Sequence, residues 1–324
     1  MTTSTMGEGS LSPQPPHGAR SAGRSRVAPA GPRVPGFRGF TVRHPIAALL
    51  VLVFSIAYPV MALPVLAMHG VIPGKDVLEG LPRDPDELSG LMLTWLALLP
   101  SAVYVTWAVE GREGIRRLFR RVLRWRFAPG WWLFILTAMP VLSVVAGLLL
   151  GDSVRSIDPA PFVVSQLAAL LVNLVLINLW EETAWAGVLQ TRLERRHNVF
   201  VAALLAAVPF GFAHWPLAFF GDVTSGSAAV ALAAYLTLGV IFRPMLGVFL
   251  RGTRDSVLLV ALLHSVFNRT NNDNGIAASL LDGQGQRLAM LIAAVALTGA
   301  TALVIRRHLG RAERAALDAV HAAR

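Results

Sequence analysis

Long apolar runs separated by short polar segments occupy the chain from about residue 45 to residue 305. A helix needs roughly 20 apolar residues to cross the hydrocarbon core of a bilayer, which is about 30 Å thick. Eight stretches are predicted to do so: 45–68, 88–109, 131–150, 162 to about 192, 199–220, 228–250, 255–268 and 288–305. The seventh is short, and we expect it to be tilted or partly re-entrant. The pattern therefore predicts an all-α fold, a polytopic membrane helix bundle of about eight transmembrane helices.

A different pattern follows the second predicted span. Between residues 111 and 126, apolar Ile115, Leu118, Phe119 and Val122 recur at helical spacing, with arginines between them. Such a basic amphipathic helix is expected to lie along the membrane surface. Its charge could also suit nucleic acid, but a helix held between two spans is poorly placed for that. We expect no nucleic-acid partner.

Composition and charge agree with a membrane protein. The chain is 54% hydrophobic and 15% charged, whereas soluble domains are about 45–50% apolar and about 25% charged. Its net charge is +10. Arginine-rich segments alternate with arginine-poor ones, and they are the N-terminus, 111–126, 192–196, 251–254 and the C-terminus. By the positive-inside rule, both termini are expected in the cytoplasm, in a multi-pass protein of the cell membrane.

The termini differ in composition from the middle of the chain. Residues 1–40 are rich in Pro, Gly, Ser and Arg, which predicts a disordered basic cytoplasmic tail. A single transmembrane domain is expected over residues 41–310, followed by a basic cytoplasmic C-terminal tail over 311–324. The absence of cysteine excludes a disulfide framework, a thiolate metal site and a cysteine nucleophile.

Few ionisable groups fall deep inside the predicted spans. Glu181 and Glu182 are the only carboxylates there, and His214 and His264 are the only histidines. An ionisable group at membrane depth is costly and usually faces a cavity or a partner. At about 1.5 Å per helical residue, Glu181, His264 and His214 lie about 16, 14 and 24 Å from the cytoplasmic side, and a bend at Pro209 would shorten the last. Three helices are thus expected to bring these groups to one depth.

Spacing within the helices supports this grouping. His264 and Asn268 are four residues apart, so both project from one helix face. Phe210 and His214 have the same relation. Glu181 and the glutamate after it are separated by about 100° around the helix, so the two are expected to have different roles.

Two carboxylates, two imidazoles and an amide around a wet cavity suit hydrolysis by an activated water. A glutamate can act as general base, and an imidazole can share the water and protonate the leaving amine. A second imidazole and an amide N–H can stabilise the oxyanion. No Ser-His-Asp nucleophile pattern is evident. Taken singly, each residue has an ordinary structural interpretation, so the prediction depends on the set.

Three motifs in order, each inside a predicted span, resemble those of the CAAX protease and bacteriocin-processing family (CPBP, or Abi). They are Glu181-Glu182 with Trp185 and Gly187, then Phe210-x-x-x-His214, then His264-x-x-x-Asn268. The family comprises intramembrane endopeptidases and includes the type II CAAX prenyl endopeptidase. The likeness covers a motif core of about 162–268, and the arginine-rich helix is also similar to that of bacterial members.

The resemblance implies an endopeptidase whose partners are the lipid bilayer and a peptide or membrane-protein substrate. Glu181 would activate the water beside His214, Glu182 would support the site, and His264 and Asn268 would form the oxyanion hole. No cofactor is required on this mechanism. Family members are often labelled metalloproteases, so a divalent metal such as zinc is possible, with Glu181, His214 and His264 as ligands. No His-Glu-x-x-His pair is present.

One departure concerns the first motif, which in the family is usually Glu-Glu-x-x-x-Arg. Here the arginine position holds Ala186. Glu182 would then be protonated, or would pair with a cation from elsewhere, for which Arg243 in the sixth span is the candidate. Asn178, one turn earlier, could help to orient Glu182. Two other functions stay open: a catalytically silent relative acting as a bacteriocin immunity or scaffold protein, and a transporter with buried Glu and His.

Overall fold

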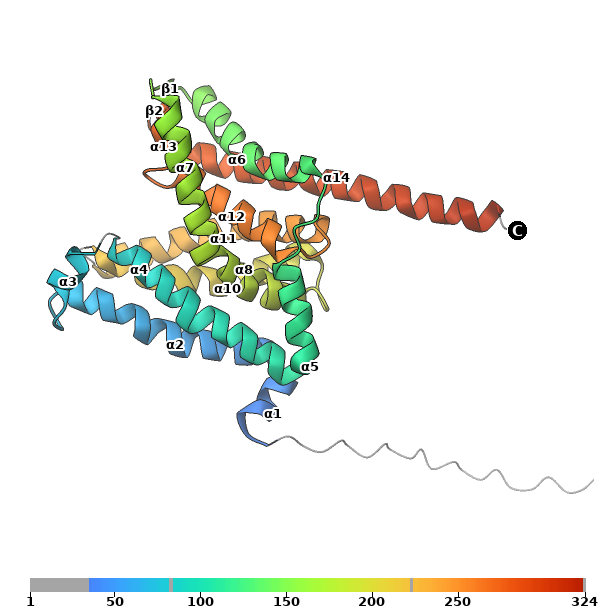
Figure 1. The fold of residues 1–324 in the computed structure, drawn as a ribbon, viewed down its shortest axis with the longest axis horizontal. Helices are drawn as coiled ribbons and strands as arrows, with labels where there is room; N and C mark the ends of the chain where they lie inside the picture. The colour runs from blue at the N-terminus through green and yellow to red at the C-terminus, as the bar shows by residue number, and fades with distance from the viewer. Residues whose placement is uncertain (1–34, 82–83, 222–223, 323–324) are drawn as a thin grey trace, which may run out of the picture. The chain divides into compact units, whose positions relative to one another are not determined.

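The computed structural model describes residues 35–81, 84–221 and 224–322, with side chains described as far as residue 306. This part is helical apart from one antiparallel pair of two-residue strands, β1 (Ser153–Val154) and β2 (Leu281–Asp282) (Figure 1). Most of the predicted N-terminal tail, residues 1–34, lies outside the described residues. Its last residues form part of helix α1 (Gly36–Arg43). The predicted C-terminal tail continues a helix as far as Ala322.

Seven helices of the described part are long and apolar enough to cross a membrane. They are α2 (Pro45–Met68); α4 (Pro85–Met92) continued by η1 (Leu93–Leu98) and α5 (Leu99–Val122); α6 (Pro129–Leu149); α7 (Pro159–Asn173) continued by η2 (Leu174–Asn178), α8 (Leu179–Ala184), η3 (Trp185–Gln190) and α9 (Thr191–Leu193); α10 (Val199–His214) with η4 (Trp215–Phe220); α11 (Ser225–Gly252); and α14 (Gln286–Ala322). Short helices α3 (Lys75–Glu79) and α13 (Ile276–Leu280) lie in loops. The predicted fold class, an all-α polytopic membrane bundle, is confirmed.

The remaining predicted span is α12 (Val257–Asn271), which is shorter than the others. Its 15 residues extend about 22 Å at 1.5 Å per residue, less than the roughly 30 Å of a bilayer core. Twelve of the 15 are buried, so protein surrounds this helix where lipid would surround a span. The eight predicted crossings therefore become seven long helices and one short inner helix.

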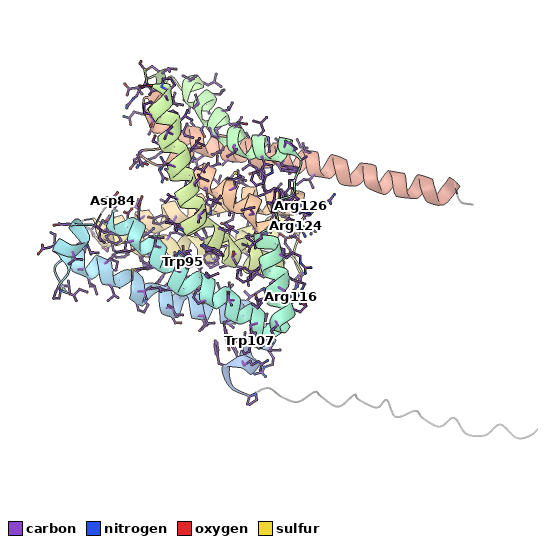
Figure 2. The ribbon with its side chains drawn as sticks, viewed as in Figure 1. Asp84, Trp95, Trp107, Arg116, Arg124 and Arg126 are labelled. Atoms are coloured by element: carbon purple, nitrogen blue, oxygen red, sulfur yellow. The ribbon has the colours of Figure 1, made fainter. Side chains whose placement is uncertain are left out.

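The second span leads directly into the basic helix, and Gly111 marks the bend between them. Gly111 has φ 64° and ψ −159° within an otherwise helical segment, a conformation that side-chain-bearing residues rarely adopt. Beyond the bend, Leu118 and Val122 are buried. The apolar face of the basic helix thus packs on protein. Figure 2 shows Arg116 at the far end of the second span from Asp84, as the alternation of charge predicts.

Helices α10 and α11 pack closely because small residues lie between them. A Cβ placed on Gly211 would be 3.2 Å from the Cα of Leu236, and one on Gly239 would be 3.0 Å from the carbonyl oxygen of Ala207. Small residues at helix interfaces allow such close approach in membranes. This approach brings the Phe210–His214 segment of α10 beside the half of α11 that carries Arg243.

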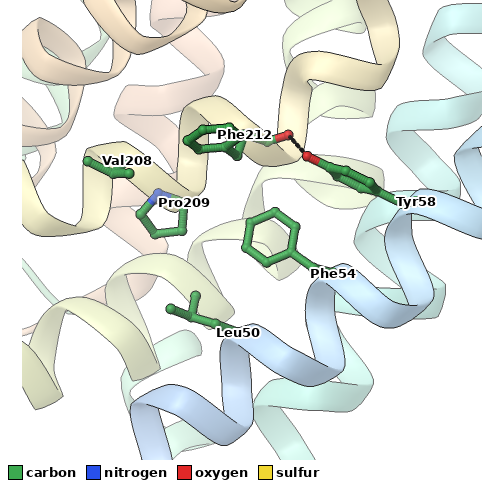
Figure 3. Close-up of a pocket in the computed structure, with 6 residues that line it drawn as sticks. All are labelled: Leu50, Phe54, Tyr58, Val208, Pro209 and Phe212. Carbon is green, nitrogen blue, oxygen red and sulfur yellow. Dashed lines mark hydrogen bonds between the residues drawn. The ribbon is translucent and has the colours of Figure 1, made fainter.

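Helix α2 supports α10 on its other side. Leu50, Phe54 and Tyr58 face Val208, Pro209 and Phe212 across an apolar cavity of about 360 Å³ (Figure 3). The Tyr58 hydroxyl donates a 3.0 Å hydrogen bond to the carbonyl oxygen of Phe212. Residue 216, four positions later, is a proline and has no N–H for that carbonyl. Where α10 ends, Tyr58 thus adds a second hydrogen bond to that carbonyl, beside the one from the backbone N–H of Trp215.

Candidate active site

The helix α8, which carries both glutamates, lies between two π-helical turns, η2 and η3. Each π turn places residues five apart on one face, and such turns are frequent at functional sites. In η2 this spacing allows Asn178 to hydrogen-bond the side chain of Asn173. Both carboxylates are buried, with Glu181 4% and Glu182 0% exposed. The pair is therefore held inside the bundle, as the sequence predicts.

Glu181 contacts two side chains. Its Oε1 lies 3.5 Å from Nε2 of His214 and accepts a 3.3 Å hydrogen bond from the indole N–H of Trp185. Nδ1 of His214 lies 2.8 Å from the carbonyl oxygen of Phe210. A carbonyl oxygen can only accept, so Nδ1 carries the proton. In the neutral ring, the lone pair of Nε2 is then directed toward the Glu181 carboxylate.

Glu182 has different partners. Nη1 of Arg243 lies 2.8 and 3.0 Å from its two carboxylate oxygens, and Nδ1 of His264 lies 2.9 Å from Oε1. The side chains of Glu182 and Arg243 are both 0% exposed. The predicted pairing of Glu182 with Arg243 is confirmed as a contact. A cation from α11 thus stands where the family's motif arginine would come from the site helix.

The ring of Phe210 joins the two groups. Its centroid is 4.3 Å from that of His214 and 6.4 Å from that of His264. The Arg243 guanidinium carbon lies 5.6 Å from the same centroid, and the Trp185 ring contacts it edge-on at 6.1 Å. The two predicted histidines, Arg243 and Trp185 therefore lie around one aromatic side chain.

The two groups differ in access. The side chain of His214 is 19% exposed and that of Glu181 is 5% exposed, whereas His264 is 5% and Glu182 is 0% exposed. The Glu181–His214 pair is therefore the part of the site that a water or a substrate can reach through the histidine. The Glu182–Arg243–His264 group is a closed ionic cluster that supports it.

The two predicted amides are placed differently. Asn268 is part-buried, one turn after His264 on α12, and its side chain makes no hydrogen bond with any described residue. The predicted contact of Asn178 with Glu182 is wrong. Its Nδ2 donates instead to Oγ of Ser265 at 3.0 Å, so Asn178 fixes α8 against α12 next to His264.

The possible zinc set, Glu181, His214 and His264, does not fit a metal site in this arrangement. Among the described residues, no three or more His, Asp or Glu side chains are grouped so as to hold an ion. Nδ1 of His264 is directed at Glu182, while Glu181 and His214 face each other. A structural or catalytic zinc site needs at least three converging protein ligands.

Trp185 belongs to the first motif, but the hydrogen bond from its indole to Glu181 is a contact that the sequence pattern does not reveal. The available signal was its spacing: it lies four residues after Glu181, and a buried indole N–H usually finds an acceptor. Replacing Trp185 by phenylalanine keeps the ring contact with Phe210 and removes the donor. We expect kcat of the hydrolysis predicted from the sequence to fall about tenfold, with little change in the melting temperature.

The control for this change is Trp95→Phe. Trp95 is 42% exposed, and its indole donates to the carbonyl oxygen of Leu176, outside the site. Its variant should keep wild-type kcat. Equal kcat values for the two variants would show that the hydrogen bond to Glu181 does not matter.

The central part of the chain is similar to a known family. The model of the family described as type II CAAX prenyl endopeptidase Rce1-like matches residues 163–270, about a third of the 324 residues. The match begins in α7 and ends in α12, so it contains all five predicted site residues and Arg243. Among curated proteins, none matches the chain.

Proposed function

We propose that this chain, whose residues 163–270 match the Rce1-like family model, is an intramembrane endopeptidase in which Glu181 and His214 activate the attacking water. This assignment rests on one observation. Glu181 is buried, yet its carboxylate faces the Nε2 lone pair of a partly exposed histidine whose other nitrogen is fixed by a backbone carbonyl.

In the proposed reaction, a water between Glu181 and His214 attacks the carbonyl carbon of the scissile peptide bond. A bond forms between the water oxygen and that carbon, the carbonyl becomes an oxyanion, and the proton of the water passes to the Glu181 carboxylate. The same proton then moves, directly or through Nε2 of His214, to the departing nitrogen as the C–N bond breaks. The products are an amine and a carboxylic acid, and the acid gives its proton to the amine or to solvent.

The oxyanion needs hydrogen-bond donors, and α12 provides two candidates. Nδ1 of His264 donates to Glu182, so its Nε2 can donate to the oxyanion in the doubly protonated ring, whose positive charge the Glu182 carboxylate stabilises. The Asn268 amide follows one turn later on the same face and has no hydrogen-bond partner among the described residues. Donors fixed before the reaction stabilise developing negative charge without reorganisation. We assign the oxyanion hole to these two side chains.

The Glu182–Arg243 pair bears on the alternative of a silent relative. That alternative drew its support from Ala186, which removes the usual cation of the motif. Arg243 provides a guanidinium at 2.8 Å from the same carboxylate. The alanine at position 186 is therefore compatible with a charge-balanced site, which supports the proposal of an active enzyme over a silent relative. We also propose that both termini lie in the cytoplasm, on the side of the arginine-rich segments.

The test is cleavage of a library of membrane peptides by the purified protein, read as new peptide termini by mass spectrometry. A Glu181→Gln preparation, purified in parallel, controls for contaminating proteases. We expect termini that only the wild type produces, in the presence or absence of a chelator. Loss on chelation would show a metal-dependent reaction. Flux of a solute across liposomes without new termini would overturn the proposal in favour of a transporter.

A further inference from the structure

An unusual turn precedes α12. Arg254 and Asp255 have φ values of 49° and 64°, and they are the only non-glycine residues with positive φ among the described residues. Side-chain-bearing residues adopt this left-handed conformation at a cost, and they keep it only where surrounding contacts fix it. Backbone hydrogen bonds to the end of α11 close the turn, among them Asp255 N–H to the carbonyl oxygen of Leu250 at 2.8 Å, and further bonds reach it from outside.

The basic helix holds this turn through two arginines. Nη1 of Arg124 donates to the carbonyl oxygen of Arg254, and Nε of Arg121 donates to that of Asp255 at 3.1 Å. In return, the hydroxyl of Ser256, the N-cap of α12, donates to the carbonyl oxygen of Arg124 at 2.9 Å. The Asp255 carbonyl is thus bound by Arg121 in the basic helix, and the Arg254 carbonyl by Arg124 just after the helix ends at Val122; Ser256 ties the start of α12 to Arg124 as well.

The guanidinium of Arg121 also reaches the site helix. Its Nη1 donates to the carbonyl oxygen of Gly187 at 3.0 Å, inside the π turn η3 that follows the glutamates. A Cβ on Gly187 would lie 3.1 Å from Cδ1 of Leu118 and 3.4 Å from Cγ2 of Val257. The basic helix, the site helix and the start of α12 therefore meet at one closely packed point, with Arg121 bonded to the site helix and to the turn that leads into α12.

We propose that Arg121 is a positioning residue, which sets the register between the helix of Glu181 and the helix of His264. This inference rests on the proposed function. Arginine suits the role because its planar fork can donate to two carbonyls at once, whereas lysine has a single nitrogen. Displacement of catalytic groups by about 1 Å can lower a rate by about 100-fold. The basic helix therefore contributes a structural contact inside the protein through Arg121.

The experiment compares Arg121→Gln with Arg120→Gln. Arg120 is the neighbouring residue, is exposed, and makes no side-chain hydrogen bond or ion pair with any described residue, so its variant removes the same charge and no contact. We expect Arg121→Gln to lower kcat about 10- to 100-fold with KM changed less than about threefold. Arg120→Gln should match the wild type. Arg121→Lys keeps the charge and has one donor nitrogen. Its kcat should lie between those of Arg121→Gln and Arg120→Gln.

A second readout separates positioning from catalysis. Amide hydrogen exchange should accelerate in segments 185–191 and 253–260 of Arg121→Gln, and should not change in Arg120→Gln. Asp255→Gly removes the strain of the left-handed turn. In the double variant Arg121→Gln/Asp255→Gly, part of the lost kcat should return.

The outcomes distinguish the two proposals. If the wild type shows no Glu181-dependent cleavage, the proposed function fails, while exchange still reports on the contacts of Arg121. If the wild type cleaves and Arg121→Gln equals Arg120→Gln in kcat, the positioning role is overturned, whatever the exchange shows. If Arg121→Gln does not accumulate as folded protein, the comparison of Arg121→Lys with Arg120→Gln decides by the same criteria.

Discussion

Replacement of Glu181 by glutamine is expected to lower kcat for peptide cleavage by about 10³-fold while the bundle stays folded. The amide cannot take the proton of the attacking water, but its oxygen can still accept the hydrogen bond of the Trp185 indole. The variant has nearly the same shape and leaves no buried cation unpaired, because Arg243 belongs to Glu182. The loss should therefore appear in kcat, with the melting temperature nearly unchanged.

The matched control is Glu113→Gln, which removes an exposed glutamate of the basic helix; the Glu113 side chain is 55% exposed. Both preparations should show the same mass, helicity and melting behaviour in detergent, and Glu113→Gln should cleave like the wild type. Cleavage by Glu181→Gln above about a tenth of the wild-type rate would mean that another group activates the water. His214 would then be the next candidate to replace.

The second large effect is expected on stability. Arg243→Leu removes the guanidinium from a carboxylate that is 0% exposed and leaves Glu182 with only His264 as a polar partner. Removal of one member of a buried ion pair typically costs about 3–5 kcal/mol, because the other charge stays buried and uncompensated. We expect a large drop in the melting temperature of the detergent-purified protein, together with loss of cleavage.

Two further variants test the cause of that drop. Glu182→Gln/Arg243→Leu removes both charges and should recover most of the stability without recovering activity. Ala186→Arg/Arg243→Leu moves the cation to the position of the family's motif, four residues from Glu182, and should be more stable than Arg243→Leu alone.

The control for this series is Arg251→Leu, also on α11. The Arg251 side chain is 62% exposed, and its ion pair with Glu194 is 3.8 Å long. Exposed pairs contribute about 0–1 kcal/mol. If Arg243→Leu proved as stable as Arg251→Leu, the buried pair would have no role in stability.

Hydrophobic patterning allowed much of the fold to be predicted, because lipid imposes a simple rule on each span. The limits of α2 agree with the sequence pattern to the residue. The length of α12 did not follow from that rule, since protein surrounds this helix and no bilayer thickness constrains it. Gly111 also gave no clear signal, although its positive φ decides where the second span ends and the basic helix begins.

The residues of the candidate site were predictable where their chemical type alone sets them apart. They were less predictable where their role depends on tertiary contacts. Glu181, Glu182, His214 and His264 stand out because charge is rare at membrane depth, and Arg243 could be nominated as a counter-ion for the same reason. The hydrogen-bond partners of Asn178 could not be predicted, because helical spacing does not reveal which neighbouring helix a side chain meets. The contacts of Arg121 depend on three segments that are distant in the sequence.

The origin of the guanidinium beside Glu182 has a consequence for how relatives of this chain are found. Positions 186 and 243 should vary together. A homologue with arginine at position 186 is free to have an apolar residue at position 243, whereas this chain has alanine at 186 and arginine at 243. A homologue with neither cation would be expected to have lost the glutamate as well. A search pattern that demands the motif arginine would pass over sequences of this kind, and one that accepts either position would include them.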